Sequence, residues 1–285
     1  MDGIGAAALV GFASLLAFNQ VVIKLTGEGF GPVFQAGLRS VLGLGVLGLW
    51  IALRRVDLQL PAGAFFWGVV SGLLFAFEFV CLYLALDLTT VSRASVIFYS
   101  MPVWLGLAAH LWLPGERLSG RRMLGLGLAL AGVALALLWR GQGAASLLGD
   151  VLALVATLAW AGIALVVRMT PQSRVSPELQ LLFQLAVSAP VLLLLAPLFG
   201  DLLRDPGPLH LAGLAFQSVC VVSLGFLLWF RLMAIYRASS VASFSFLSPV
   251  LAVILGWLIL GESAGPQVWA ALGLVAGGVF LINRR

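Results

Sequence analysis

Runs of about 20 uncharged, apolar residues recur from one end of this 285-residue chain to the other. A helix of roughly that length is needed to cross the hydrocarbon core of a bilayer. Charged residues make up only 9% of the chain and hydrophobic residues 62%, whereas soluble domains average roughly 25% and 45–50%. The sequence therefore predicts an all-α integral membrane protein.

Charged residues, prolines and glycines interrupt these apolar runs at regular intervals. The runs predict ten transmembrane helices, near residues 3–23, 32–53, 61–86, 91–113, 119–139, 147–168, 177–198, 208–235, 239–260 and 265–283. The segments between them, such as 54–57 and 114–117, are too short to form a soluble domain. Any functional site is therefore expected inside the helix bundle.

The Lys and Arg residues are distributed unevenly between alternate loops. If the N-terminus is cytoplasmic, the outer loops carry few basic residues, namely Lys24, Arg93, Arg140 and Arg204. An excess of Lys and Arg marks cytoplasmic loops. We therefore expect a multi-pass protein of the cytoplasmic (inner) membrane, surrounded by lipid, with both termini in the cytoplasm. The net charge of +5 then reflects topology, and no nucleic-acid partner is expected.

The two halves of the chain resemble each other at a constant offset. Residues 102–105 (Pro-Val-Trp-Leu) resemble residues 249–252 (Pro-Val-Leu-Ala), and a Gly-Glu pair follows each segment, with an offset of 145 to 147 residues along the chain. Each half, 1–140 and 141–285, then holds five predicted helices. Because five is odd, we expect two inverted five-helix repeats in one compact transmembrane unit. This architecture is typical of secondary transporters that work by alternating access.

The residues that carry a family resemblance are spread along the whole chain: Asn19 and Lys24, the 85–102 stretch with Ser95 and Pro102, the Gly-Glu pairs 115–116 and 261–262, and the glycines 277–278. On these residues the chain resembles the ten-helix EamA-type branch of the drug/metabolite transporter superfamily. Within that branch it is most similar to the YddG-type exporters of aromatic amino acids. The resemblance implies an inverted five-plus-five fold, cytoplasmic termini and export of a small metabolite.

One position departs from the family pattern. Family members often carry Trp eight residues before the Lys of the first helix, where this chain has Leu16. The second half does have a tryptophan at the matching place, Trp160, before Arg168.

Two ionisable residues lie deep inside predicted helices, where a charge is costly unless it has a functional or structural partner. Glu78 lies roughly 12 Å and Arg39 roughly 10 Å from the same predicted membrane face. Tyr99 falls in the same layer. This set suits a zwitterionic amino acid, with Arg39 binding the carboxylate, Glu78 the ammonium group, and Tyr99 with Trp104 or Trp160 forming an aromatic wall. In the alternative, Arg39 and Glu78 pair with each other as a gate or structural bridge.

Uncharged polar residues inside the predicted helices complete the candidate substrate-binding set: Asn19, Gln35, Gln184, Ser243 and Ser245. Gln184 corresponds to Arg39 at the repeat offset, which predicts a polar but uncharged inner vestibule. The alternative reading is that these Gln and Ser side chains hydrogen-bond between neighbouring helices and hold them together.

Several motifs of soluble enzymes are absent from the sequence or out of context. The G-x-G-x-x-G at 43–48 falls inside a predicted helix, where close helix packing explains it better than dinucleotide binding. The same packing is expected at the pairs Gly68/Gly72 and Gly273/Gly277. The sequence contains no P-loop, zinc-protease motif or nucleophile elbow.

The two cysteines, Cys81 and Cys220, are isolated in apolar segments and give no metal-ligand spacing. We therefore expect no catalytic residues, no metal and no cofactor. The sequence predicts a secondary transporter that exports aromatic and other neutral amino acids, driven by the substrate gradient, protons or another ion. The alternatives are export of another small metabolite or drug, and an intramembrane enzyme acting on a lipid-linked substrate. That enzyme would need clustered acids, whereas the loops carry single, scattered ones.

Overall fold

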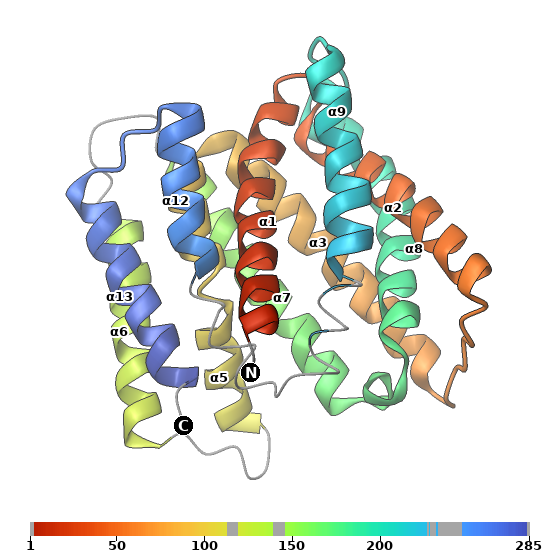
Figure 1. The fold of residues 1–285 in the computed structure, drawn as a ribbon, viewed down its shortest axis with the longest axis horizontal. Helices are drawn as coiled ribbons and strands as arrows, with labels where there is room; N and C mark the ends of the chain where they lie inside the picture. The colour runs from red at the N-terminus through yellow and green to blue at the C-terminus, as the bar shows by residue number, and fades with distance from the viewer. Residues whose placement is uncertain are drawn as a thin grey trace.

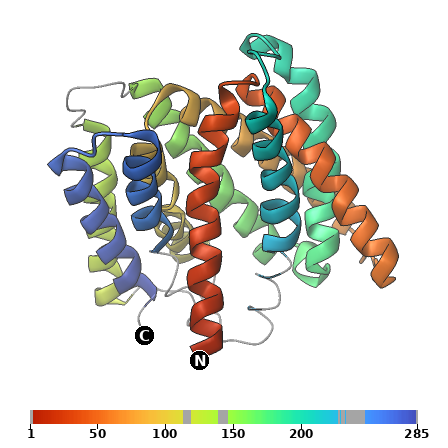
Figure 2. The same ribbon diagram turned by 45° about the horizontal axis from the view of Figure 1, so that its top comes forward.

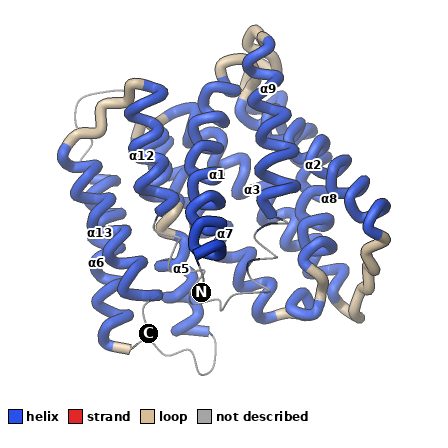
Figure 3. The backbone as a smooth tube through the Cα atoms, viewed as in Figure 1, coloured by secondary structure: helices blue, strands red, loops and turns tan. Residues whose placement is uncertain are grey.

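The structure is a computed structural model that describes residues 3–112, 119–138, 146–226, 228, 232 and 247–283. These parts of the chain are helical throughout, apart from loops and one isolated β-bridge between Phe30 and Leu203. The helices are α1 (Gly3–Gly27), α2 (Pro32–Arg54), α3 (Ala64–Leu88), α4 (Val91–Phe98), α5 (Met101–Trp112), α6 (Gly120–Leu138), α7 (Leu147–Met169), η1 (Pro171–Arg174), α8 (Pro177–Leu195), η2 (Ala196–Phe199), α9 (Pro208–Phe216), η3 (Gln217–Gly225), α12 (Leu247–Leu260) and α13 (Pro266–Asn283). The prediction of an all-helical chain is confirmed for these residues (Figure 3).

Eight helical segments of the described chain are long and apolar enough to cross a membrane. They coincide with the first eight predicted helices, and the chain is a multi-pass membrane protein. Two shorter apolar helices, Leu247–Leu260 and Pro266–Ile282, fall on the ninth and tenth predicted spans. Residues 239–246 of the ninth span lie outside the described residues. The count of ten membrane crossings and their inverted repeat therefore stay predictions.

The helices form a bundle in which partners distant in sequence lie side by side. In Figure 1, α6 and α13 lie together at one edge and α2 and α8 at the other, with α1, α3, α7 and α12 between them. Figure 2 shows the same order from a second direction. The helix α1 begins and α13 ends at one end of the bundle. We call the opposite end, where α1 ends, the Lys24 end.

The predicted fourth span, 91–113, is broken into α4 and α5. The break follows from Pro102, which has no N–H group and whose ring clashes with the carbonyl four residues earlier in a continuous helix. The carbonyl oxygen of Ile97 at the break accepts hydrogen bonds from the hydroxyl groups of Ser100 (2.6 Å) and of Thr157 on α7 (3.2 Å). The break is therefore held by a neighbouring helix, and Tyr99 lies directly at it.

The predicted eighth span, 208–235, also departs from a plain α-helix. It begins as α9 and continues as the nine-residue π-helix η3, in which hydrogen bonds join residues five apart. Segments of π-helix are rare and are frequently found at functional sites. The apolar pattern predicted a membrane span here but not its change of geometry.

Glycines allow close helix packing at some of the predicted positions. A Cβ atom on Gly72 would lie 2.5 Å from Cβ of Val187 on α8, and Gly68 is equally crowded, so the prediction for this pair is confirmed. The prediction for Gly273/Gly277 is wrong, because no described atom outside their own helix turn lies within 4 Å of a Cβ atom placed there. Helix α13 instead packs against α6 through Gly278.

Candidate functional site

Arg39 on α2 and Glu78 on α3 are both buried in the bundle, on helices that pack against each other. Their side chains are 3% and 4% exposed, and they are close enough to interact electrostatically. In the part of the chain that the structure describes, however, they form no direct ion pair. The Nε atom of Arg39 and the Oε2 atom of Glu78 are buried without a hydrogen-bond partner among these residues. A direct bridge between the two side chains is therefore not the arrangement seen.

An aromatic ladder on α3 holds Arg39 in place. Phe75, Phe79 and Tyr83 follow each other at intervals of four residues, so their rings lie on one face of the helix. The guanidinium carbon of Arg39 lies 4.2 Å from the centre of the Phe79 ring, in a cation–π contact. The same guanidinium group is within hydrogen-bonding reach of the Tyr83 hydroxyl.

A buried network of uncharged polar side chains continues from Tyr83. The Tyr83 hydroxyl donates to Oε1 of Gln217 at 2.8 Å, and Nε2 of Gln35 donates to the same oxygen at 3.3 Å. Nε2 of Gln217 donates to Oγ1 of Thr26 at 3.1 Å. We call Thr26, Gln35, Tyr83 and Gln217 the Gln217 network. It joins α1, α2 and α3 to the π-helix η3.

Sequence reasoning identified Gln35 but missed Gln217 and Tyr83. Gln217 is fully buried and is the first residue of the π-helix. An amide in the middle of a predicted membrane helix is a signal that could have found it, because such a group needs hydrogen-bond partners inside the bundle.

A second polar and aromatic cluster surrounds Tyr99. Nε2 of Gln20 on α1 donates to the Tyr99 hydroxyl at 3.3 Å, and that hydroxyl donates to the carbonyl oxygen of Leu16 at 3.1 Å. Trp160 on α7 meets Tyr99 edge-on, with ring centres 6.5 Å apart, and stacks on Phe98 at 4.9 Å. The structure thus brings together Tyr99 and Trp160, two members of the predicted aromatic wall.

The remaining predicted site residues lie in different surroundings. Asn19 is buried next to Gln20, and its Oδ1 atom has no partner among the described residues. The indole of Trp104 donates to Oγ of Ser100, one turn earlier in the chain, at 3.1 Å. Gln184 on α8 donates to the hydroxyl of a serine on α3, as expected for a side chain that joins two helices. Ser243 and Ser245 lie outside the described residues.

Unpartnered buried polar atoms gather in the first four helices. Within the described chain, six such atoms belong to Asn19, Gln20, Gln35, Arg39, Glu78 and Ser95. Each residue lies roughly three to ten positions from the Lys24 end of its helix, which is a layer about 5–15 Å deep. Buried polar groups in proteins are nearly always hydrogen-bonded. A layer of unpaired groups therefore indicates a place for water or for a polar ligand.

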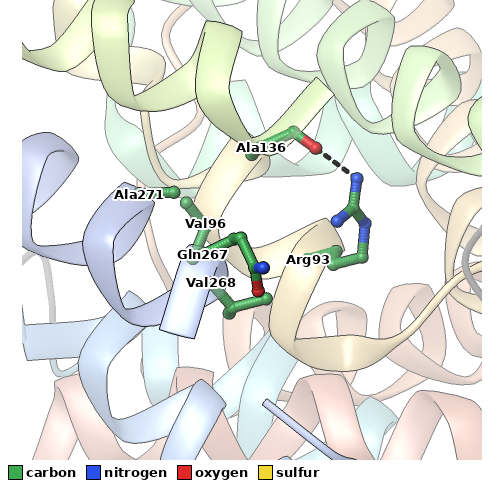
Figure 4. A pocket seen from close by; sticks show the side chains of 6 residues that line it. All are labelled: Arg93, Val96, Ala136, Gln267, Val268 and Ala271. Atoms are coloured by element: carbon green, nitrogen blue, oxygen red, sulfur yellow. Dashed lines mark hydrogen bonds between the residues drawn. The ribbon is translucent and has the colours of Figure 1, made fainter. Parts of the chain in front are cut away.

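A small hollow lies elsewhere, between α4, α6 and α13 (Figure 4). It is lined by Arg93, Val96, Ala136, Gln267, Val268 and Ala271. The guanidinium group of Arg93 points to the carbonyl oxygen of Ala136 and donates a hydrogen bond to it. The side chains leave no room for an enclosed water molecule. None of its lining residues has an unpartnered buried atom among the described residues, so we do not place the functional site there.

At the Lys24 end, the turn between α3 and α4 is surrounded by charged side chains with partners. Nζ of Lys24 donates to the carbonyl oxygens of Leu86 (2.8 Å) and Thr89 (2.6 Å), at the end of α3. The Glu262 carboxylate accepts from the first two backbone N–H groups of α4 at 2.6 and 2.9 Å, and from the Ser92 hydroxyl at 2.7 Å. The two charges match the partial charges of these helix ends.

A buried ion pair completes this turn. Arg93 on α4 and Asp150 on α7 form a salt bridge of 2.6 Å, with side-chain exposures of 5% and 0%. Asp150 also accepts a hydrogen bond from the Thr89 hydroxyl at 3.0 Å. We call Lys24, Arg93, Asp150 and Glu262, with the turn that they bind, the α3–α4 junction.

Known proteins resemble this chain over nearly its whole length. The uncharacterized transporter YvbV of Bacillus subtilis is 31% identical, over 89% of this chain and 83% of its own. An uncharacterized protein of Pseudomonas aeruginosa is 34% identical, over 96% and 91%. A Salmonella typhimurium protein named as a probable amino-acid metabolite efflux pump is 26% identical, over 94% and 92%. A protein of known crystal structure shares the fold, with a TM-score of 0.66 at 24% identity, covering 97% of this chain and 98% of that one.

The model of the EamA-like transporter family matches residues 3–138 and, a second time, residues 147–284. Together the two matches include nearly all of the chain. They confirm the resemblance seen at Asn19, Lys24 and the Gly-Glu pairs, whereas the narrower YddG-type group stays a prediction. The chain therefore belongs to the EamA-like transporter family.

Proposed function

We propose that this chain is a secondary transporter that exports amino acids, aromatic and other neutral ones, from the cytoplasm by alternating access. The observation that carries the proposal is the pair Arg39 and Glu78. Both are buried at one depth on neighbouring helices, they form no direct ion pair with each other, and each keeps an unpartnered atom among the described residues. An isolated charge in this position is unfavourable, and a zwitterion would satisfy both charges at once.

The chemistry of these two charges and of the polar and aromatic groups of the bundle fits an α-amino acid. The planar guanidinium group of Arg39 offers charge-assisted hydrogen bonds to a carboxylate, and the Glu78 carboxylate offers acceptors to an ammonium group. Phe79, which contacts Arg39, and its neighbour Phe75 supply an apolar surface for a side chain, with Tyr99 and Trp160 as a second aromatic cluster. The amide oxygens of Asn19 and Gln20, unpartnered within the described chain, add acceptors for the ammonium group.

Two further observations support transport by rocking of two halves. The family model matches the chain once in each half, as expected for repeats 1–140 and 141–285. Five predicted helices in each half imply that the repeats are inverted, with the site between them.

The distribution of Lys and Arg favours cytoplasmic termini in the inner membrane. The relatives named as transporters or as an efflux pump favour transport over an intramembrane enzyme.

Uptake of radiolabelled phenylalanine into liposomes that contain the purified protein tests the proposal. We expect saturable uptake that an excess of unlabelled aromatic amino acid suppresses. The same assay with and without an imposed proton gradient distinguishes proton-driven transport from transport down the substrate gradient. If folded protein takes up no amino acid, the family assignment stands but the amino-acid substrate is refuted.

Variants of the two charges localise the site within the same assay. Glu78→Gln and Arg39→Met should each abolish or strongly weaken phenylalanine uptake, because each removes the partner of one charge of the zwitterion. Glu178→Gln, at the start of α8 and away from this layer, is the matched control and should transport like the wild type. Full activity of both site variants would move the substrate site elsewhere in the bundle.

A further inference from the structure

The Tyr83 hydroxyl is oriented by the residue behind it. A phenol has one proton to donate, and Tyr83 donates it to Oε1 of Gln217 at 2.8 Å. The lone pairs of its oxygen are left to accept. Arg39, within reach of this oxygen, carries only donors. Tyr83 therefore donates to Gln217, and any hydrogen bond between Tyr83 and Arg39 runs from Arg39 to Tyr83.

The amide of Gln217 cannot be turned around without loss. Its Oε1 accepts from both Tyr83 and Gln35, and its Nε2 donates to Thr26. A flipped amide would set its NH₂ group against two donors, and Gln217 is fully buried, so no water replaces the lost bonds. The donor side of Gln35 is itself anchored, because its Nε2 also donates to the carbonyl oxygen of Ile23 at 3.2 Å.

These contacts restrict the orientation of the Arg39 guanidinium group. The guanidinium carbon lies 4.2 Å from the centre of the Phe79 ring, and the Tyr83 hydroxyl is within hydrogen-bonding reach of the guanidinium group. A planar group fixed in this way has fixed directions for its other N–H bonds. One of these donors, Nε, has no partner among the described residues and is buried. Fixing a binding group before the ligand arrives lowers the entropic cost of binding.

We infer that Gln217 and Tyr83 are positioning residues for recognition of the substrate carboxylate: they hold Arg39 in the orientation that binds it, without touching the substrate. This inference rests on the proposed function, because that function gives Arg39 its ligand. It also makes carboxylate recognition depend on both halves of the chain, since Arg39 and Tyr83 belong to the first half and Gln217 lies on η3 in the second.

The test compares the half-saturation concentration for phenylalanine uptake into liposomes that contain one of four proteins. These are the wild type, Tyr83→Phe, Gln217→Met and the double variant. Methionine keeps the length of glutamine but removes its hydrogen bonds. Each single variant should raise the half-saturation concentration roughly tenfold, the effect of losing one hydrogen bond to a charged group, with little change in maximal rate. The double variant should be no worse than either single one, because both changes break the same chain of hydrogen bonds.

A matched control separates positioning from general damage to the fold. Gln172 is also a buried glutamine, and its Nε2 donates to the Ala64 carbonyl oxygen at 2.7 Å, but it lies outside the Gln217 network. Gln172→Met should leave the half-saturation concentration unchanged. If Gln217→Met does not fold, Thr26→Val removes the acceptor of the Gln217 amide and should give a smaller effect in the same direction.

Three results would overturn the inference. The first is a Gln217→Met protein with the half-saturation concentration of the Gln172→Met control. The second is a lowered maximal rate at unchanged half-saturation, which would assign Gln217 to the conformational cycle. The third is a double variant in which the two single effects multiply. If the wild type itself transports no amino acid, the proposed function has failed; if it transports and the variants do not differ, only the positioning role has failed.

Discussion

The α3–α4 junction and the middle of α3 both bury charged side chains, but in different states. At the junction, Arg93 and Asp150 form a buried salt bridge, and the Glu262 carboxylate accepts three hydrogen bonds. In the middle of α3, Glu78 and its neighbour Arg39 form no direct ion pair and keep unpartnered atoms among the described residues. Paired charges of the first kind hold helices together, whereas unpaired charges of the second kind destabilise the empty protein.

The difference indicates which charges are structural and which bind a ligand. Removing a member of a satisfied set should lower stability and reduce transport only through that loss. Removing an unsatisfied charge should reduce transport and leave stability unchanged or higher. Four substitutions, in order of expected effect, test this distinction.

Asp150→Ala should be the most damaging of the four substitutions. It leaves the buried Arg93 without its carboxylate, and breaking a buried ion pair in this way costs roughly 3–5 kcal/mol. Thermal unfolding of the detergent-solubilised protein, monitored by size-exclusion chromatography, should show a large drop in melting temperature. A variant that melts like the wild type would show that the junction does not hold the fold.

Arg39→Met should have the opposite profile. We expect its melting temperature to stay close to that of the wild type, because Arg39 forms no direct ion pair that would be broken and Met has a similar length. Its half-saturation concentration for phenylalanine should rise roughly 100-fold, the effect of losing a charge-assisted contact of about 2.7 kcal/mol. A destabilised Arg39→Met protein would place Arg39 among the structural charges.

Glu262→Gln should have an intermediate effect on stability. The amide keeps one acceptor oxygen for the start of α4 but loses the negative charge that complements the helix terminus. The expected loss is about 1–2 kcal/mol, measured as a lower melting temperature with an unchanged half-saturation concentration. A selective change in substrate affinity would contradict this structural role.

Arg204→Gln should have the smallest effect. Arg204 forms a bidentate salt bridge with Asp87 at 2.6 and 3.0 Å, but both side chains are about one-third exposed, at 32% and 28%. The hydrogen bond from Arg204 to Asp87 raises the pKa of Arg204 above its ordinary value, so its charge is present at any pH of interest. Exposed pairs of this kind contribute at most about 1 kcal/mol. A loss of stability as large as that of Asp150→Ala would show that burial does not determine how much a charge pair contributes to stability.

The positions of the helices could be predicted from the sequence, because lipid requires apolar side chains over the length of each span. The internal geometry of the spans could not. The break at Tyr99 depends on Pro102 together with Thr157, a partner on α7 that the local sequence does not reveal. The π-helix at Gln217, a residue hydrogen-bonded to Thr26 on α1, was likewise not predicted.

The depth of the candidate site residues in the membrane could be predicted from the sequence, but the directions in which their side chains point could not. Counting residues placed Arg39 and Glu78 in one layer, and the structure places them close enough to interact. Which face each helix turns to its neighbours depends on tertiary packing. The indole of Trp104 is hydrogen-bonded to Ser100, and its place in the aromatic wall stays a prediction. The hydrogen bond between Tyr83 and Gln217, which depends on such packing, was not predicted.

The π-helix that begins at Gln217 shifts the register of the backbone hydrogen bonds within one membrane helix. Each of its hydrogen bonds spans one residue more than an α-helical bond. Converting a single turn to α-helical bonding would rotate one part of the helix against the other by about 100° and slide it by ~1.5 Å. The side chains that follow this segment therefore face directions that a plain 3.6-residue period would not assign to them.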